Sequence, residues 1–235
     1  MLILDNQYEV FFFEYFKKQG YSKQQMYQFV KHNKFNKKAY GIYTLKGQNP
    51  EPLSYIEAYE RQCNKRVYVG ALSALRLHGV SQNIPFNTRY QIYYNEQRIN
   101  RWLLDQKDYI WTRNNLFNSS VGITKKNNLS LSSPERAILE AISLLPKQGD
   151  FEEVYHTLLL LPSLRPQLLM DLICECKSIK TKRLFLYMLK HVNFTWKSKL
   201  DLSKVDIGKG IRQLYPEGKL DPDYHLYVPE IHDEV

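Results

Sequence analysis

Residues 15–50 read YFKKQGYSKQQMYQFVKHNKFNKKAYGIYTLKGQNP. The segment holds eight lysines and no aspartate or glutamate, so it carries a formal charge of +8. The whole chain of 235 residues has a net charge of +9, and the rest of it is nearly balanced, with 25 basic against 24 acidic side chains. Charge this concentrated is typical of a surface that binds a polyanion such as nucleic acid.

The order of elements around this segment predicts a winged helix-turn-helix. Aromatic residues at helical spacing indicate a first helix from about Asn6 to Lys18, which Gly20 ends. Ser22 is a good N-cap, and a second helix runs from it to about His32. A basic hairpin follows, because residues 39–45 are rich in the β-branched and aromatic residues that strands favour.

The second helix has an apolar face that includes Met26, so Gln24, Gln28 and Lys31 fall on its opposite face. In a helix-turn-helix the second helix enters the major groove, where a glutamine can pair with adenine and lysines can contact guanine or phosphate. We expect the lysines of the hairpin to meet the DNA backbone or the adjacent minor groove. The predicted DNA-binding residues are Lys17, Lys18, Lys23, Gln24, Gln28, Lys31, Lys34, Lys37 and Lys38.

The loop at residues 47–52, Gly-Gln-Asn-Pro-Glu-Pro, is the best linker candidate in the chain. We therefore expect a DNA-binding domain at residues 1–50 and a second domain at residues 51–235, with a candidate subdomain junction near residue 95. The expected fold class is α+β, with a winged helix-turn-helix followed by a mixed α/β domain whose second half is helical. Ser133 as N-cap and Pro134 at the first helical position mark where that helical half begins.

Other elements of the second domain follow from the same patterns. Helices are predicted at about 54–63, 70–77, 151–160, 165–177 and 180–191, strands at 89–94 and 109–112, a polar, turn-rich stretch at 114–128, and short strands and turns at 201–229. Basic residues also gather near the last of these helices. Two interpretations stay open for them, a solvated helix face and a second surface for DNA or a partner. The residues of this second basic cluster are Lys177, Lys180, Lys182, Arg183 and Lys190.

Several polar or aromatic residues are expected to have structural roles. We expect Tyr27 and Tyr40 to pack rather than stack on bases, and His78 to be a satisfied histidine at a helix end. Cys174 and Cys176 lack a second pair at zinc-like spacing, so no metal site is expected. Glu135, Arg136 and Glu140 are expected to cap and pair within the fold.

The sequence gives little support to an enzyme or a membrane protein. It has no Gly-rich phosphate loop, no Gly-x-Ser-x-Gly and no His-Glu-x-x-His motif, so neither catalysis nor a cofactor is expected. No apolar run approaches the ~20 residues that span a bilayer, and the N-terminus does not read as a secretory signal. Three cysteines, an odd number, fit a reducing compartment, so we expect a cytoplasmic protein.

Four stretches resemble the AbiEi-type antitoxins, the transcriptional-regulator half of bacterial abortive-infection toxin–antitoxin pairs. They occur in the same order and spacing as in that family, across nearly the whole chain. In this sequence Tyr40 precedes the wing glycine, where family wings often carry a basic residue. The stretches are FNKKAYGIY (35–43), SALRLHG (73–79), SPERAILE (133–140), and KRLFL (182–186) with the later VDIG (205–208) and YHLYVP (224–229).

The resemblance implies a winged helix-turn-helix that represses its own operon and a C-terminal domain that counteracts a nucleotidyltransferase-like toxin. The implied partners are duplex operator DNA and that toxin. The alternative interpretation is a protein–protein interaction module whose basic arm binds RNA or other anions without sequence preference. Sequence alone leaves the operator, the toxin and the oligomeric state open.

Overall fold

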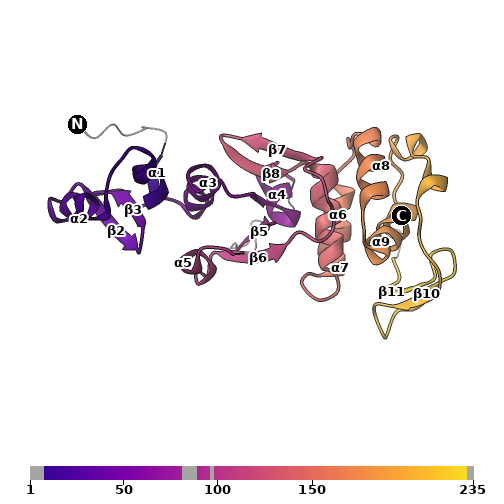
Figure 1. Cartoon of the computed structure of the whole chain (residues 1–235). Helices are drawn as coiled ribbons and strands as arrows, with labels where there is room; N and C mark the ends of the chain where they lie inside the picture. Colours follow the sequence, from indigo (N-terminus) through magenta and orange to yellow (C-terminus); the bar gives the residue numbers. More distant parts are fainter. Residues whose placement is uncertain (1–7, 81–88, 96–97, 232–235) are drawn as a thin grey trace.

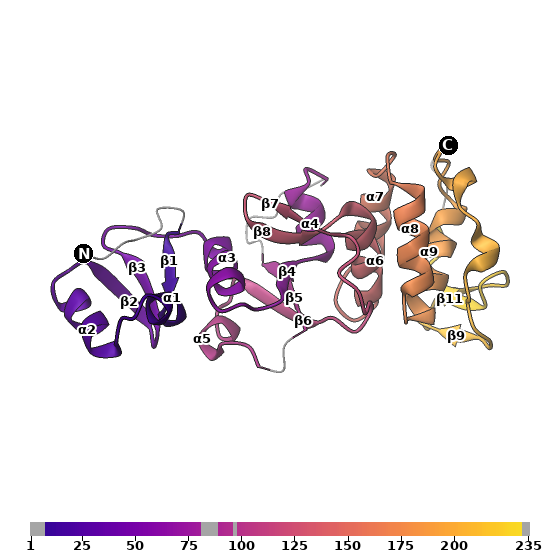
Figure 2. The same cartoon turned by 45° about the horizontal axis from the view of Figure 1, so that its top comes forward.

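Three groups of elements lie in a row along an elongated molecule (Figure 1). The computed structural model describes residues 8–80, 89–95 and 98–231. A small N-terminal unit stands at one end, a mixed sheet occupies the middle, and a group of helices with a small C-terminal sheet forms the other end. Figure 2 shows the same order from a second direction. The expected fold class is confirmed, with a winged unit first and a helical second half last.

From residue 8 onward, the N-terminal unit contains two helices and a three-stranded antiparallel sheet of order β1-β3-β2. Its helix-turn-helix pair comes between the first strand and the β2–β3 hairpin, which forms the wing. The elements are β1 (Val10–Phe12), α1 (Phe13–Lys18), α2 (Lys23–Lys31), β2 (Phe35–Ala39) and β3 (Ile42–Leu45). The second helix and the hairpin match the sequence prediction.

The first predicted helix is wrong in its N-terminal part, because Val10–Phe12 form a strand that pairs with β3. All three residues are buried, and they face two different cores. Phe11 packs in an aromatic cluster under α1 and α2, whereas Val10 and Phe12 belong to the main core of the chain. A strand buried on both faces has no polar alternation, so its apolar residues resemble a helical pattern.

The N-terminal unit is joined to the middle of the molecule by more than the loop after β3. Phe12 packs on Tyr59 of α3 (Pro52–Gln62), with ring centroids 5.4 Å apart. The buried side chain of Gln62 completes the free edge of β1. Its Oε1 accepts a hydrogen bond from the Phe12 N–H at 2.7 Å, and its Nε2 donates to the Val10 carbonyl at 2.8 Å. One amide thus satisfies backbone groups that an edge strand leaves unpaired.

The middle of the molecule is a five-stranded mixed sheet of order β6-β5-β4-β8-β7. Its strands are β4 (Val67–Val69), β5 (Tyr90–Tyr94), β6 (Tyr109–Arg113), β7 (Ile123–Lys126) and β8 (Leu129–Ser132), and its connections include α4 (Ala71–Leu77) and α5 (Arg101–Leu104). The sequence predicted β5, β6, α3 and α4. It did not predict β4, β7 or β8, which are too short to show a clear period.

The remaining described residues form the helical half and a small sheet of order β10-β11-β9. Ser133 and Pro134 begin α6 as expected. The elements are α6 (Pro134–Leu144), α7 (Phe151–Leu159), α8 (Pro166–Glu175), α9 (Ile179–Lys190), β9 (Arg212–Gln213), β10 (Lys219–Asp221) and β11 (Leu226–Val228), with two 3₁₀ turns at Lys197–Lys199 and Leu202–Lys204.

Candidate nucleic-acid interface

The start of α2 is fixed by a capping box. The Ser22 side chain accepts a hydrogen bond from the Gln25 N–H at 3.2 Å, and the Gln25 side chain accepts one from the Ser22 N–H at 2.8 Å. The sequence indicated Ser22 but not Gln25, although Gln at the third helical position after a serine cap is the known signal. The turn before α2 uses Gly20 at φ +82°, a conformation that glycine adopts readily.

An aromatic cluster holds α1, α2 and the wing together. The rings of Phe16 and Phe35 lie 5.4 Å apart at nearly right angles, and Met26 of α2 is fully buried among them. Edge-to-face contacts of this kind add to the free energy gained by burying the rings. The cluster therefore sets the position of α2 relative to the wing without using any polar side chain of α2.

The outer face of α2 matches the sequence prediction. Gln24, Gln28 and Lys31 are exposed, while Met26 on the opposite face is buried. All nine predicted DNA-binding residues are exposed, so none of them packs in the core. Four of them lie on α2, Lys34 lies in the turn after it, Lys37 and Lys38 lie on β2, and Lys17 and Lys18 lie at the end of α1.

Two of the lysines are engaged within the protein. The Lys18 ammonium donates to the Gln62 carbonyl at 2.8 Å. The Lys23 ammonium donates to the Tyr40 hydroxyl and lies 4.9 Å from the centroid of the Tyr40 ring, and this hydrogen bond raises the pKa of Lys23. The other lysines keep ammonium groups at the surface, with Lys34 over the Phe29 ring at 5.4 Å.

Tyr27 and Tyr40, which we expected to pack rather than to stack on bases, are not packed in the core. Their exposed fractions are 66% and 74%, which makes them two of the large hydrophobic side chains that the structure leaves on the surface. Both line a hollow of about 620 Å³ between α2 and the wing, together with Lys23 and Lys37. Aromatic and basic side chains around one hollow are typical of surfaces that meet nucleic acid. Sequence spacing gave no signal for this, because Tyr27 lies on the flank of α2.

The second basic cluster does not form a surface. Lys182 and Arg183 are buried in α9. Lys180 donates to the carbonyls of Ser143, at 2.6 Å, and Leu145, at the end of α6. The other internal bonds join Arg183 to the carbonyls of Ile207 and Gly210, each at 2.6 Å, and Lys190 to Asp221 and Asp223 at 3.2 and 2.6 Å.

Both interpretations, the solvated helix face and the second DNA or partner surface, are therefore wrong for Lys182 and Arg183. Lys180 and Lys190 form hydrogen bonds within the protein. Lys177 is exposed. The sequence placed them all in one helical region but could not show that α9 is buried on nearly every side. Cations at the carbonyl end of a helix are favoured by the helix dipole, which explains the position of Lys180.

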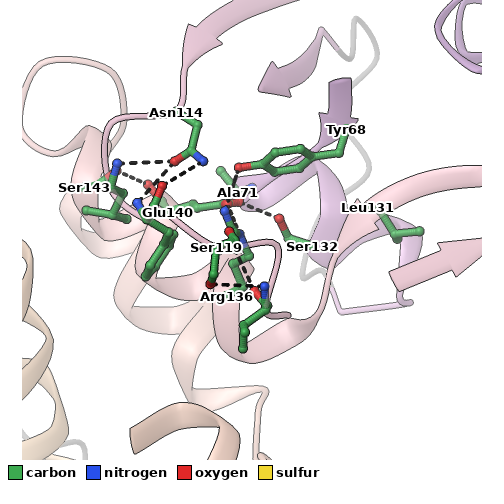
Figure 3. A network of polar contacts seen from close by, with 12 residues as sticks. Tyr68, Ala71, Asn114, Ser119, Leu131, Ser132, Arg136, Glu140 and Ser143 are labelled. Atoms are coloured by element: carbon green, nitrogen blue, oxygen red, sulfur yellow. Dashed lines mark hydrogen bonds and ion pairs between the residues drawn. The ribbon is translucent and has the colours of Figure 1, made fainter. Parts of the chain in front are cut away.

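The Ser-Pro-Glu-Arg stretch builds a buried polar network between α6 and the central sheet (Figure 3). Glu140 and Arg136 are both 0% exposed, and Arg136 Nε donates to Glu140 Oε1 at 2.9 Å. Glu140 also accepts hydrogen bonds from Tyr68 Oη at 3.0 Å, Ser132 Oγ at 2.7 Å and the Ala71 N–H at 3.1 Å. The expected pairing role of Arg136 and Glu140 is confirmed.

The guanidinium of Arg136 reaches further partners. It donates to the carbonyls of Ser119 and Val121 at 3.1 and 2.6 Å, and its carbon lies 4.4 Å from the Phe117 ring centroid. The network therefore joins β4, β8, α6 and the loop before β7. The three guanidinium nitrogens of Arg136 and both carboxylate oxygens of Glu140 have hydrogen-bond partners, which makes the buried charges tolerable. These contacts hold α6 against the central sheet.

The Ser-Ala-Leu stretch of α4 joins the helix to strands on both sides. Ser73 Oγ accepts a hydrogen bond from the Gln91 N–H at 2.9 Å on β5. His78 Nε2 lies 2.9 Å from the Ser132 carbonyl oxygen on β8, and Gly79 follows at φ +83°. The prediction that His78 is a satisfied histidine at a helix end is confirmed.

Glu135 ties the start of α6 to the start of α8. Its carboxylate accepts three hydrogen bonds at 2.9 Å from Arg165, two from the guanidinium and one from the backbone N–H. Burial acts to raise the pKa of Glu135, but these hydrogen bonds outweigh it and bring the pKa to about 2. The charged form of Glu135 is therefore more stable in the folded chain than in the unfolded one.

We expect Glu135→Gln to lower the free energy of unfolding by about 2 kcal/mol at pH 7, because the stabilised carboxylate is lost. The loss is smaller than the full pKa shift implies, because the guanidinium of Arg165 is largely exposed and screened by water. Because the folded pKa is depressed, this contribution is present above the unfolded value near 4.5 and is lost as the pH falls toward 2. Urea unfolding of both proteins should show a difference that shrinks by more than half between pH 7 and pH 3. A difference independent of pH would contradict this assignment.

No helix in the described ranges is long and apolar enough to cross a membrane. In the same ranges no three histidine, cysteine, aspartate or glutamate side chains come together as a metal ion would need. Cys63, Cys174 and Cys176 are free thiols, and Cys176 is buried.

Two family models match the chain. The model described as the N-terminal domain of the AbiEi antitoxin transcriptional regulator covers residues 7–86, and the model described as "Transcriptional regulator, AbiEi antitoxin, Type IV TA system" covers residues 84–229. A comparison with curated proteins found no match. The crystal structure of the Rv2827c protein from Mycobacterium tuberculosis has a similar fold, with a TM-score of 0.66 and 12% identity over 94% of this chain and 86% of that one.

The matched residues include the wing, the α4 stretch and the buried network described above, and together they run through nearly the whole chain. The chain belongs to the AbiEi antitoxin family of transcriptional regulators of type IV toxin–antitoxin systems.

Proposed function

We propose that the chain binds operator DNA with its winged helix-turn-helix, represses its own toxin–antitoxin operon and counteracts a nucleotidyltransferase-like toxin. The observation that carries the proposal is the outer face of α2. Gln24, Gln28 and Lys31 are exposed on it, and the wing lysines Lys37 and Lys38 are exposed beside it. An α-helix with such a face fits the major groove, and the lysines can reach phosphates on either side.

In this proposal the residues have separate roles. Gln24 and Gln28 read base edges, because a glutamine side chain offers both a donor and an acceptor to adenine. The phosphate contacts come from five exposed lysines, Lys17, Lys31, Lys34, Lys37 and Lys38. Lys18 and Lys23 are also exposed, but their ammonium groups already bind the Gln62 backbone carbonyl and the Tyr40 hydroxyl, so we assign them a supporting role at the edge of the surface.

The domain assignment is part of the proposal. Residues 1–50 would form the DNA-binding domain and residues 51–235 the antitoxin domain, with a subdomain junction near residue 95. The contacts of Gln62 with β1 mean that α3 supports the DNA-binding unit from outside it. Experiments on DNA binding therefore need the full chain rather than a fragment that ends before α3.

Gln28→Ala and Lys37→Ala should affect DNA binding in different ways. We expect Gln28→Ala to weaken operator binding by about 1–3 kcal/mol while binding to random duplex stays nearly unchanged, because a base contact is lost. Lys37→Ala should weaken both by similar factors, because a phosphate contact carries no sequence information. Competition binding of the full chain with both probes measures the two ratios.

A uniform loss from Gln28→Ala would remove the base-reading role of α2. Equal affinity of the unmodified chain for operator and random DNA would favour the alternative, a basic arm that binds anions without sequence preference. Gln19→Ala offers a matched control, because Gln19 is an exposed glutamine at the end of α1, outside the proposed groove face.

A further inference from the structure

A cavity of about 510 Å³ lies on the side of the central sheet where α4, β5 and β6 approach α6 and α7. Two arginines, Arg76 and Arg89, and Gln91 line it, together with the apolar side chains of Leu72 and Ile110. Pockets that bind small molecules have this size and this combination of an apolar wall with a few polar groups. The cavity is separate from the proposed DNA-binding surface, which uses none of these residues.

Arg76 is a partly buried cation without an ion-pair partner among the described residues. Its guanidinium donates to Ser73 Oγ at 2.9 Å, one turn earlier in α4. Burial lowers the pKa of Arg76, and the negative charge of Glu153, which also lines the cavity, opposes that shift. The Glu153 carboxylate does not come within the 4.0 Å of the Arg76 guanidinium that an ion pair requires. A desolvated cation with one neutral hydrogen-bond partner gains free energy when an oxyanion binds it.

The groups beside Arg76 are held in place by backbone contacts. Arg89 Nε and Nη2 donate to the carbonyls of Lys107 and Tyr109 at 3.1 and 3.3 Å, so its charge is fixed at the cavity. Gln91 Oε1 accepts from the Ser73 N–H at 3.2 Å, which orients the amide of this side chain. A ligand would thus meet donors that lose little conformational entropy on binding.

We propose that this cavity binds a small organic oxyanion, with Arg76 as its main anchor and the apolar wall against the body of the ligand. The anionic group is a carboxylate or a phosphate monoester, because the planar guanidinium pairs with both through two parallel hydrogen bonds. The Glu153 carboxylate competes with the ligand for Arg76. The Glu153 carboxylate also repels an anionic ligand and so lowers its affinity for the cavity.

Isothermal titration calorimetry of the full chain tests the proposal with three probes: benzoate, adenosine 5′-monophosphate and inorganic phosphate. We expect saturable binding of at least one of the two probes with a ring, and weaker binding of inorganic phosphate. Preference for benzoate or for the nucleotide identifies the anionic group. Arg76→Gln should weaken binding of that probe at least tenfold, and the affinity of Arg76→Lys should lie between those of Arg76→Gln and the unmodified chain. Glu153→Gln should tighten binding severalfold.

Two controls separate this site from others. Arg113→Gln changes an exposed arginine at the end of β6, outside the cavity, and should leave affinity unchanged. Lys37→Ala should also leave it unchanged, and a loss there would place the probe on the wing and overturn the proposal. The proposal would also be overturned if neither ring probe showed saturable binding to the unmodified protein, or if neither bound Glu153→Gln. Equal affinity for inorganic phosphate and the ring probes would overturn it too. Glu153→Gln keeps the test valid if Arg76→Gln does not fold.

Discussion

Replacing Arg136 by methionine is expected to lower the free energy of unfolding by about 3–5 kcal/mol, the range for breaking a buried ion pair from one side. The variant leaves the Glu140 carboxylate 0% exposed and without its cation. It also leaves the carbonyls of Ser119 and Val121 without their donor. Urea unfolding at pH 7, followed by circular dichroism, measures the loss.

The matched control is Arg113→Met, which changes an exposed arginine at the end of β6 and should shift stability by no more than about 0.5 kcal/mol. The double variant Arg136→Met/Glu140→Leu should lose less than the sum of the two single variants, because no unpaired charge remains. If Arg136→Met lowered the free energy of unfolding by less than about 1 kcal/mol, the network would not be what holds α6 against the sheet.

The N-terminal unit was largely predictable because its signals are local. The Ser22 cap and the exposed Gln28 follow from spacing along one helix, and the wing follows from its turn and aromatic residues. The strand at Val10–Phe12 could not be predicted, because its partners in β3 lie about thirty residues away and α3 covers its other face. Short strands such as β4 are defined by neighbours rather than by their own pattern.

The site residues divide in the same way. Exposure of the α2 face could be predicted from the burial of Met26 on the opposite side. The exposure of Tyr40 and the internal bonds of Lys18 and Lys23 depend on how the wing and α3 meet α1 and α2 in space. Burial of Arg183 depends on carbonyls that lie about 24 to 42 residues further along the chain, which no local pattern contains.

The largest expected effect on function comes from removing the exposed cations of α2 and the wing. Each phosphate contact contributes about −0.9 to the log–log dependence of affinity on salt concentration. Replacing four of them by glutamine should therefore reduce DNA affinity by about 10³ at 0.1 M salt. The residues are Lys31, Lys34, Lys37 and Lys38, all exposed in the folded chain.

A control with the same change in net charge distinguishes a defined surface from general attraction. Its substitutions replace exposed lysines outside the N-terminal unit by glutamine, at Lys107, Lys147, Lys177 and Lys199. We expect this control to lose much less affinity than the variant of α2 and the wing, since long-range attraction is screened beyond about 10 Å at 0.1 M salt.

The salt dependence of duplex DNA binding, measured for the full chain and both variants, is the most direct test of a DNA-binding surface built on α2. With about five phosphate contacts, the unmodified chain and the control should show log–log slopes of roughly −4 to −5, and the variant of α2 and the wing a slope of about −1. A nearly flat dependence for the unmodified chain, or an equal change in slope for both variants, would contradict it.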